Sequence, residues 1–293
     1  MKKFLGMTTP ASLVTSIMPT VIGFLFAFSY YHVFNWQDSV ILFIAVVSFH
    51  MAVNAWDQFA DSTRLKGDSY NNNLAKIGIS AHYAKTVIWT LVIISTVLGV
   101  YLVYRTGWPL LIIGLISFAV GYFYAGGPKP ISSTPFGELF AGLTMGYNIT
   151  LLGAYVNTYQ LNPSGLYWKV LIVAIPAILT ISNILLANNI CDYKEDVEMG
   201  RKTIVAYAGQ KGALHIWNYS YLFAYLGILL AIILQLVPPF ALAVAFTIPT
   251  VNKKVKRFNH EQIKSKTFMV SIIIAVDILV AYALTIGLGM FIK

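Results

Sequence analysis

Long apolar blocks recur along almost the whole chain, and each spans about 15–25 residues, the length that a helix needs to cross a bilayer. Hydrophobic residues make up 58% of the sequence and charged residues 11%, against about 25% charged in a typical soluble domain. So few charges cannot cover a soluble surface of this size. We therefore predict an all-α integral membrane protein with nine transmembrane helices in one domain, residues 1–293, the helices lying near 11–34, 38–60, 82–104, 108–125, 136–157, 167–190, 214–236, 238–251 and 268–291.

Basic residues predict the orientation of these helices. If the N-terminus is cytoplasmic, all 20 Lys and Arg face the inside except Arg105, Lys169 and Lys293, a strong positive-inside bias. The basic stretches 191–211 and 252–266 share one side only if an even number of helices separates them, so two helices fit between residues 214 and 251. We expect a multi-pass protein of the cell membrane with a cytoplasmic N-terminus. Its net charge of +9 then requires no nucleic-acid partner.

The first apolar stretch predicts a retained helix, because it is too long for a signal-peptide core and lacks a small-residue cleavage site. The single cysteine, Cys191, excludes an internal disulfide and a cysteine metal cluster.

An eight-residue pattern, Asn-x-x-Asp-x-x-x-Asp, occurs twice with identical spacing. On a helix its three polar positions fall within an arc of roughly 60°. Paired carboxylates without Cys or His are typical of Mg²⁺, which also shares its coordination shell with substrate phosphates. The two copies therefore predict an enzyme that holds a diphosphate between two metal sites. The polar residues are Asn54, Asp57 and Asp61 in the first motif, and Asn189, Asp192 and Asp196 in the second.

A structural alternative is that acids collect at helix ends simply because water reaches them there. The repeated spacing argues against it, as does the cost of ionised groups at membrane depth, which makes such groups functional by default. We assign Asp38 and Asp277, which lie outside the motifs, to interfacial or packing roles.

Basic side chains follow both motifs, and they predict phosphate binding. Arg201 and Lys202 come after the second motif, behind a turn that Gly200 permits; ordinary positive-inside decoration is the alternative. Arg64 and Lys66, with Asp68, come after the first motif in a segment that we expect to close over the headgroup of a bound diphosphate.

The segment 122–138 carries a third group of candidate residues. Gly126-Gly127-Pro128 and Pro130 predict a tight turn, with Lys129 on it. Tyr124 precedes the turn, where its ring either stabilises a cation or anchors the helix at the membrane interface. His50, one turn before Asn54, is more typical of helix packing than of a ligand.

Three segments carry a resemblance to a known family: 54–68, 124–138 and NNICDYKEDVEMGRKT at 188–203. In them the chain resembles the intramembrane prenyltransferases of the UbiA superfamily, most of all the 1,4-dihydroxy-2-naphthoate prenyltransferases (MenA type) of menaquinone synthesis. The helix pattern extends the likeness over most of the chain. Cys191 stands where that branch usually carries arginine.

The resemblance implies a horseshoe of nine helices around a central cavity that opens laterally to lipid. An isoprenyl diphosphate would place its headgroup at the two motifs and its tail toward the bilayer. Two Mg²⁺ ions would be held by Asp57, Asp61, Asp192 and Asp196, with Asn54, Asn188 and Asn189 as neutral helpers. Lys129, Arg201 and Lys202 would stabilise the departing diphosphate, and an aromatic acceptor would attack the allylic cation. No obligate protein partner is implied.

The acceptor implied by the resemblance is a flat bicyclic anion. For its site we select Tyr124, Lys129 and Ser133, with Glu138 orienting Lys129 or a ring hydroxyl.

Two alternatives remain open at this point. One is the same chemistry on another acceptor: 4-hydroxybenzoate, homogentisate, or a haem or chlorophyll precursor. The other is a secondary transporter, which predicts acids near the bilayer midplane and a symmetric pair of broken helices. The acids here cluster at one face instead, and Pro19, Pro176 and Pro249 form no such pair.

Overall fold

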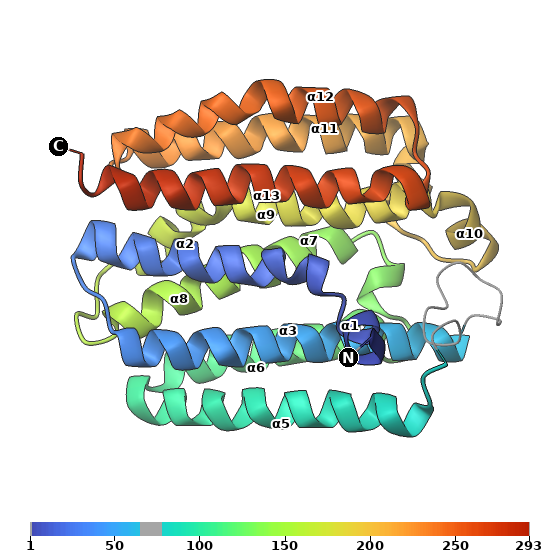
Figure 1. Ribbon diagram of the computed structural model, residues 1–293, viewed down its shortest axis with the longest axis horizontal. Helices are drawn as coiled ribbons and strands as arrows, with labels where there is room; N and C mark the ends of the chain where they lie inside the picture. The colour runs from blue at the N-terminus through green and yellow to red at the C-terminus, as the bar shows by residue number, and fades with distance from the viewer. Residues whose placement is uncertain (1, 65–77, 293) are drawn as a thin grey trace.

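The computed structural model describes residues 2–64 and 78–292, with side chains for 3–62 and 78–292, and contains helices but no strand within these ranges (Figure 1). The long helices lie roughly parallel or antiparallel in the figure. The α-helices are α1 (Lys2–Thr8), α2 (Val14–Tyr31), α3 (Trp36–Arg64), α5 (Ala81–Thr106), α6 (Trp108–Ala125), α7 (Gly137–Ala141), α8 (Ile149–Thr158), α9 (Leu166–Cys191), α10 (Tyr193–Glu198), α11 (Ile204–Ile233), α12 (Ile248–His260) and α13 (Lys264–Gly289). The other helical turns are η1 (Pro10–Leu13), η2 (Ile131–Ser133), η3 (Gly142–Asn148) and η4 (Pro239–Thr247).

Eight helical segments among the described residues are long and apolar enough to cross a membrane. They match the predicted helices except the eighth, near 238–251, so the predicted number of nine is not confirmed. That segment is helical, but it begins as the 3-10 helix η4 and continues as α12, which carries Lys253, Lys254, Lys256 and Arg257. Pro249 has no N–H to donate to the preceding turn, which favours the tighter winding before it.

Two helix boundaries differ from the prediction. Helix α11 begins at Ile204, ten residues before the predicted start, and bends at Gly209, whose φ is 69°. Helix α12 runs to His260 rather than ending before Lys253. Both errors have one cause. The prediction placed each helix boundary next to polar residues, but Lys and Arg side chains can extend to water from a helix that continues. The short helices α1 and α10 were not predicted.

The predicted helix 136–157 is one rod with three kinds of winding: α7, the π-helical segment η3, and α8. Gly142 and Gly146 lie against α9, where a Cβ on Gly146 would come within 2.6 Å of the Ile178 backbone nitrogen. Small residues four apart let membrane helices approach closely. This contact holds η3 against the helix that carries the second motif.

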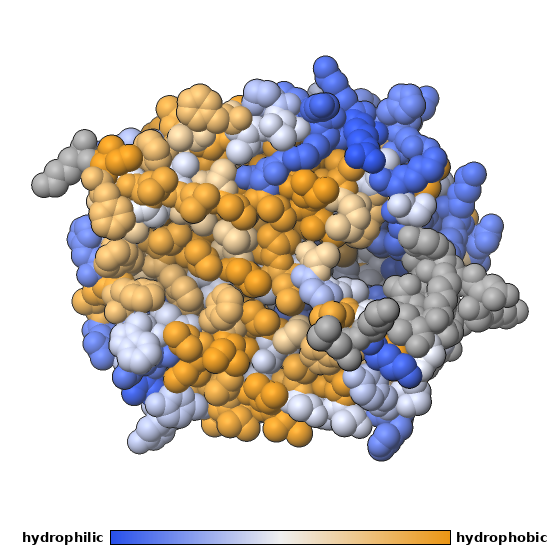
Figure 2. Space-filling view, in the orientation of Figure 1, coloured by the Kyte–Doolittle hydropathy of each residue, from blue (hydrophilic) through white to orange (hydrophobic). Residues whose placement is uncertain are grey.

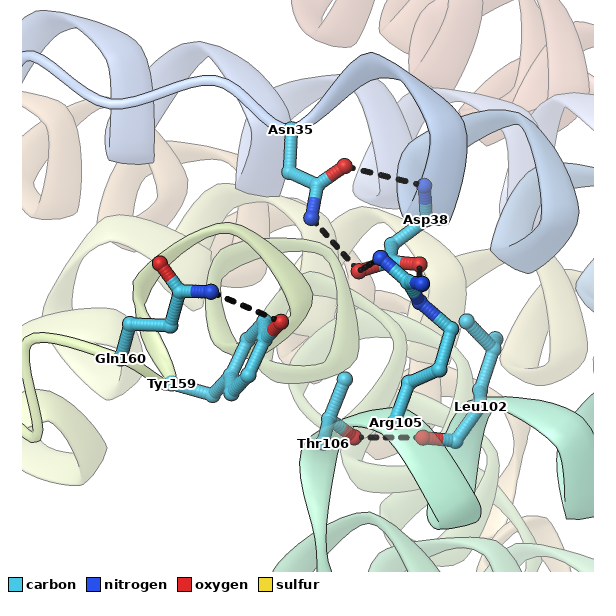
Figure 3. A network of polar contacts seen from close by, with 7 residues as sticks. All are labelled: Asn35, Asp38, Leu102, Arg105, Thr106, Tyr159 and Gln160. Carbon is cyan, nitrogen blue, oxygen red and sulfur yellow. Dashed lines mark hydrogen bonds and ion pairs between the residues drawn. The ribbon is translucent and has the colours of Figure 1, made fainter.

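A polar network closes the end of the bundle away from the motifs (Figure 3). Arg105, at the end of α5, donates from Nε to Oδ1 of the buried Asp38 over 2.6 Å, and Asn35 Nδ2 donates to Asp38 Oδ2 over 2.6 Å. The interfacial or packing role expected for Asp38 agrees with this pairing. Asp277, on α13, pairs with Lys254 on α12 and so joins those two helices.

The surface agrees with a membrane protein. Apolar side chains cover the middle of the face shown in Figure 2, and hydrophilic ones gather toward the end where α12 turns into α13 and where α10 lies (Figures 1 and 2). The protein is therefore a multi-pass membrane protein whose polar groups concentrate at the end that carries the motifs.

Candidate active site

The second motif lies where α9 ends and α10 begins. Asp192 stands between the two helices and is 7% exposed. Its Oδ2 accepts a hydrogen bond from Asn188 Nδ2 over 3.2 Å and pairs with the ammonium group of Lys264, the first residue of α13. Asp192 is thus held by a neutral amide and a cation from a distant part of the sequence.

Asp196 and Arg201 form the next part of the site. Gly200, with φ of 70°, turns the chain back so that the Arg201 N–H donates to the Asp196 carbonyl over 2.8 Å. Arg201 Nη1 lies 2.9 Å from Asp196 Oδ1 in an ion pair. Asp196 is 1% exposed, and this burial raises the pKa of its carboxyl to about 6, although the Arg201 guanidinium acts in the opposite direction. Neither carboxylate oxygen accepts a well-aligned hydrogen bond from the described residues.

Arg201 also ties the second motif to the turn that follows α6. Its Nη2 donates to the Ser132 carbonyl over 3.0 Å, and the Lys202 N–H donates to the Ser133 carbonyl over 3.1 Å. Glu138, at the start of α7, is buried and accepts from Asn189 Nδ2 over 2.8 Å. Its second oxygen, Oε2, is buried without a hydrogen-bond partner in the described parts of the chain.

Tyr124, near the end of α6, connects the first motif with residues around the second. Its hydroxyl interacts electrostatically with Asp57 and Asp61 of the first motif, and with Arg201 and Glu138. Glu138 in turn interacts with Asp196. Tyr124, Glu138 and Arg201 therefore link the two motifs electrostatically, although 135 residues separate the motifs in the sequence.

The first motif is anchored by the N-terminal segment. Asn54 Nδ2 donates to the Thr8 carbonyl over 3.0 Å and to Ser12 Oγ over 2.9 Å. One turn earlier on α3, the buried His50 Nδ1 lies 2.8 Å from Ser16 Oγ. The packing interpretation of His50 agrees with this contact.

Several of the predicted site residues contribute no side-chain contact to the site described above. Lys129 and Lys202 are exposed, and Ser133 contributes a backbone carbonyl. The expected contact of Glu138 with Lys129 is wrong, because Glu138 binds Asn189 and Lys129 makes no ion pair or hydrogen bond with the described residues. Lys66, Asp68 and the Arg64 side chain lie outside the described residues.

Lys264 was missed by sequence reasoning. It is one of several lysines in the basic stretch 252–266, and nothing in the spacing of that stretch distinguishes it from its neighbours. Only the packing of α13 against α9 shows which lysine reaches the motif.

An apolar cavity of about 250 Å³ lies between α3, α5, α6, η3, α8 and α9, and Asn54 is the residue of the motifs that lines it. Asn54 and Tyr124 line its polar end, and Leu42 and Leu110 line the far end. At 1.5 Å per residue, the twelve positions from Leu42 to Asn54 correspond to roughly 18 Å along α3. Phe49 and Phe118 stack inside, with centroids 4.1 Å apart. The polar end is therefore suited to a headgroup and the remainder to a hydrocarbon.

The donor set fits a hard cation that is completed by a ligand. No three His, Cys, Asp or Glu side chains come together as a metal cluster within the described residues. Each motif instead offers two carboxylates, and Asp196 has buried oxygens without aligned hydrogen bonds. This arrangement suits Mg²⁺, which takes one or two carboxylates together with substrate phosphates.

Comparison with known proteins identifies the family. The model of the UbiA prenyltransferase family matches residues 16–289. This chain belongs to the UbiA prenyltransferase family. One relative, the 1,4-dihydroxy-2-naphthoate octaprenyltransferase of Bacillus subtilis (strain 168), is 30% identical over 260 residues, which are 86% of this chain and 80% of that protein. The protein is thus an aromatic prenyltransferase, and the transporter alternative is not supported.

Solved structures show the same fold as this UbiA-family chain. A UbiA homologue from Aeropyrum pernix K1, solved without ligand, has a TM-score of 0.73 at 17% identity and covers 95% of this chain and 96% of its own. A UbiA homologue from Archaeoglobus fulgidus bound to GPP and Mg²⁺ has a TM-score of 0.64 at 15% identity, covering 97% and 99%. The predicted all-α membrane fold of the UbiA type is therefore confirmed, apart from the exact helix count.

Proposed function

We propose that this enzyme transfers a polyprenyl group from an isoprenyl diphosphate to 1,4-dihydroxy-2-naphthoate, with Mg²⁺ bound at the two aspartate motifs. One observation carries the proposal: Tyr124, which lines an apolar cavity, interacts electrostatically with Asp57 and Asp61 of the first motif and with Arg201, and Arg201 forms an ion pair with Asp196 of the second. A diphosphate with a hydrocarbon tail has the same division between a charged and an apolar part.

Asp57 and Asp61 on one side, and Asp192 and Asp196 on the other, would hold the metal. Bound Mg²⁺ supplies positive charge that stabilises the diphosphate as it leaves. The structure of the Archaeoglobus homologue with GPP and Mg²⁺ supports this cofactor. Because the motif occurs twice, we propose two Mg²⁺ ions, one at each copy.

Arg201 contributes fixed positive charge at the same place. Its guanidinium is held by the Ser132 carbonyl and Asp196, so it is already oriented and binds the leaving diphosphate without much reorganisation. Tyr124 presents its ring at the mouth of the cavity, where its π face stabilises the allylic cation that remains when the carbon–oxygen bond breaks.

The cavity walls keep this cation from water. The lining beyond Asn54 and Tyr124 consists mainly of Leu, Ile, Val, Phe and small residues. An apolar enclosure suppresses hydrolysis of a reactive intermediate, so the acceptor ring becomes the available nucleophile.

The observations that support the proposed acceptor differ from those that support the proposed donor. The Bacillus relative is named for 1,4-dihydroxy-2-naphthoate, and Tyr124, Lys129 and Ser133 are the positions that we propose for its anionic ring. Lys129 is exposed and Ser133 half-buried, so both are accessible to an acceptor that enters from the polar end.

A paired assay tests the proposal. Membranes containing this chain are given Mg²⁺ and a long-chain isoprenyl diphosphate, with 1,4-dihydroxy-2-naphthoate and 4-hydroxybenzoate offered in parallel. We expect prenylation of the naphthoate and its loss on chelation with EDTA. Prenylation of 4-hydroxybenzoate alone would overturn the acceptor and leave the metal chemistry standing, and full activity in EDTA would overturn the metal site.

A further inference from the structure

Lys264 reaches the second motif from the start of α13, a distant segment of the sequence. It is the first residue of α13, and its Nζ pairs with Asp192 Oδ2 across a separation of 72 residues. Its side chain is 20% exposed and that of Asp192 is 6% exposed. The pair therefore lies mostly out of water, where an ion pair forms only with good geometry and both groups present.

The position of Lys264 in the first turn of α13 is electrostatically unfavourable unless Asp192 is beside it. The N-terminus of a helix carries a partial positive charge, so a lysine in the first turn is repelled by the dipole. The first turn of α13 contains no acidic residue. Asp192 supplies the missing negative charge, and Asp196 also interacts electrostatically with Lys264.

Both carboxylates of the second motif are therefore neutralised by side chains, Asp192 by Lys264 and Asp196 by Arg201. A divalent ion bound by these carboxylates would take over this neutralisation. Arg201 would stay in place on the Ser132 carbonyl, Lys264 would be released from Asp192, and the charge of both would become available for phosphate oxygens.

We propose that Lys264 is a diphosphate-binding residue, held on Asp192 until the metal-bound diphosphate arrives and then transferred to a phosphate oxygen. The proposal rests on the proposed function, since it requires a diphosphate at the motifs. Lysine suits this transfer because its ammonium is a compact charge on a flexible stem with three donors. Arg201 is the fixed cation of the pair, and Lys264 is the one that moves.

Lys266 provides a matched control. It has the same charge and lies on the same helix, two residues further along, but it pairs with Glu261 over 2.8 Å. Its side chain is 60% exposed. A general loss of positive charge at this end of the protein would affect Lys266 and Lys264 alike, whereas a specific contact would not.

The test measures binding to purified protein, in the absence of turnover. Inorganic pyrophosphate with excess Mg²⁺, and Mg²⁺ alone, are titrated by calorimetry into wild type, Lys264→Met, Lys264→Arg and Lys266→Met. For Lys264→Met we expect at least about tenfold weaker Mg²⁺-pyrophosphate binding, the effect of losing one charge-assisted contact. Mg²⁺ alone should bind Lys264→Met as tightly as wild type or more tightly, because its competitor is gone. Lys264→Arg should recover part of the loss, and Lys266→Met should stay within about twofold of wild type.

Two results would overturn the assignment of Lys264. Equal pyrophosphate affinity in Lys264→Met and wild type would remove Lys264 from the diphosphate site. A parallel loss of affinity for Mg²⁺ alone would make it a positioning residue for Asp192. Wild type that binds no Mg²⁺-pyrophosphate would overturn the proposed function as well, so the two failures are distinguishable.

Discussion

Asp192 and Asp196 are buried carboxylates just after the membrane helix α9, and each has a basic partner: Lys264, 72 residues away in the sequence, and Arg201, five residues away. Burying an ionised group is costly unless it is paired. Lys264 and Arg201 offset that cost in the metal-free protein, and a bound cation would do so during turnover.

Replacement of Asp192 by Asn should remove activity while preserving the fold. Asn has the same shape but lacks the negative charge that a hard cation requires, so we expect at least about a 100-fold loss in kcat/KM. Glu261→Gln is the control, because Glu261 lies at the same end but pairs only with the exposed Lys266 among the described residues. Rates would be measured in Mg²⁺-containing membranes at equal protein level. Similar losses in both variants would contradict the assignment.

The pH dependence of the protein's stability should reveal the protonation of Asp196. Burial raises its pKa to about 6, so the folded protein binds this proton more tightly than the unfolded chain, whose Asp has its ordinary pKa of 3.8. The contribution of Asp196 to stability therefore falls as pH rises from about 4 to 6, and it is constant above that window. Thermal unfolding in EDTA across pH 4–8 measures this slope. Asp196→Asn should flatten it, and an unchanged slope would contradict the assignment.

At the scale of elements, helix α9 organises the site from both of its faces. It carries the start of the second motif at its C-terminal end, and along its length it packs against η3, α11 and α13. Its contact with η3 depends on backbone proximity at Gly142 and Gly146. The precision of the motif thus depends on packing that lies several turns away.

Gly146→Leu should destabilise the protein. Even a Cβ at this position meets the Ile178 backbone within 2.6 Å, and backbone cannot move aside as a flexible side chain does. We expect a loss of at least about 2 kcal/mol, measured by thermal unfolding in detergent. Gly99→Ala is the control, since a Cβ at Gly99 meets no heavy atom within 4 Å. Equal unfolding temperatures for Gly146→Leu and wild type would contradict this packing argument.

Gly114→Leu should alter donor preference rather than stability. Gly114 lines the cavity, and a Cβ there meets nothing within 4 Å, so a leucine fills open space in the half of the cavity that is remote from Tyr124. We expect kcat/KM to fall more for long isoprenyl diphosphates than for short ones, by about tenfold in the ratio. Ile116→Leu, on the exposed side of α6, is the control. An unchanged ratio would place the tail elsewhere.

At the scale of the whole molecule, the two ends of the helix bundle carry different groups of charged residues. One end holds both motifs, Arg201 and Lys264, and the other holds the network of Asp38 and Arg105 (Figure 3). The charge distribution predicts that the motif end faces the cytoplasm, where diphosphates and Mg²⁺ are present in solution.

Cysteine labelling should establish this orientation. Cys191 is the single cysteine, so Cys191→Ser provides a cysteine-free background. Into it are introduced Ser164→Cys, between α8 and α9, and His260→Cys, at the end of α12; both positions are exposed. A membrane-impermeant maleimide should label position 164 in intact cells and position 260 only after permeabilisation. The reverse pattern would show the opposite topology.

The sequence by itself determined the class of fold and the grouping of the first motif on one helix face. Apolar length specifies membrane helices because the bilayer has a fixed thickness, and eight of the nine predicted segments correspond to helices suited to crossing it. Helical periodicity groups Asn54, Asp57 and Asp61 on α3, because neighbours on a helix face are set by local geometry alone. The same expectation is wrong for the second motif, because α9 ends before Asp192 and Asp196 lies on the separate helix α10.

Tertiary structure decided which distant residues meet. The Lys264–Asp192 pair, the Glu138–Asn189 hydrogen bond and the interactions of Tyr124 with Asp57 and Arg201 all depend on how α13, α7 and α6 pack beside α9 and α3. A lysine in a basic stretch has the same local signature whether it faces water or a carboxylate. Contacts between helices are fixed by side-chain packing across the whole bundle, and that information is not contained in any one segment.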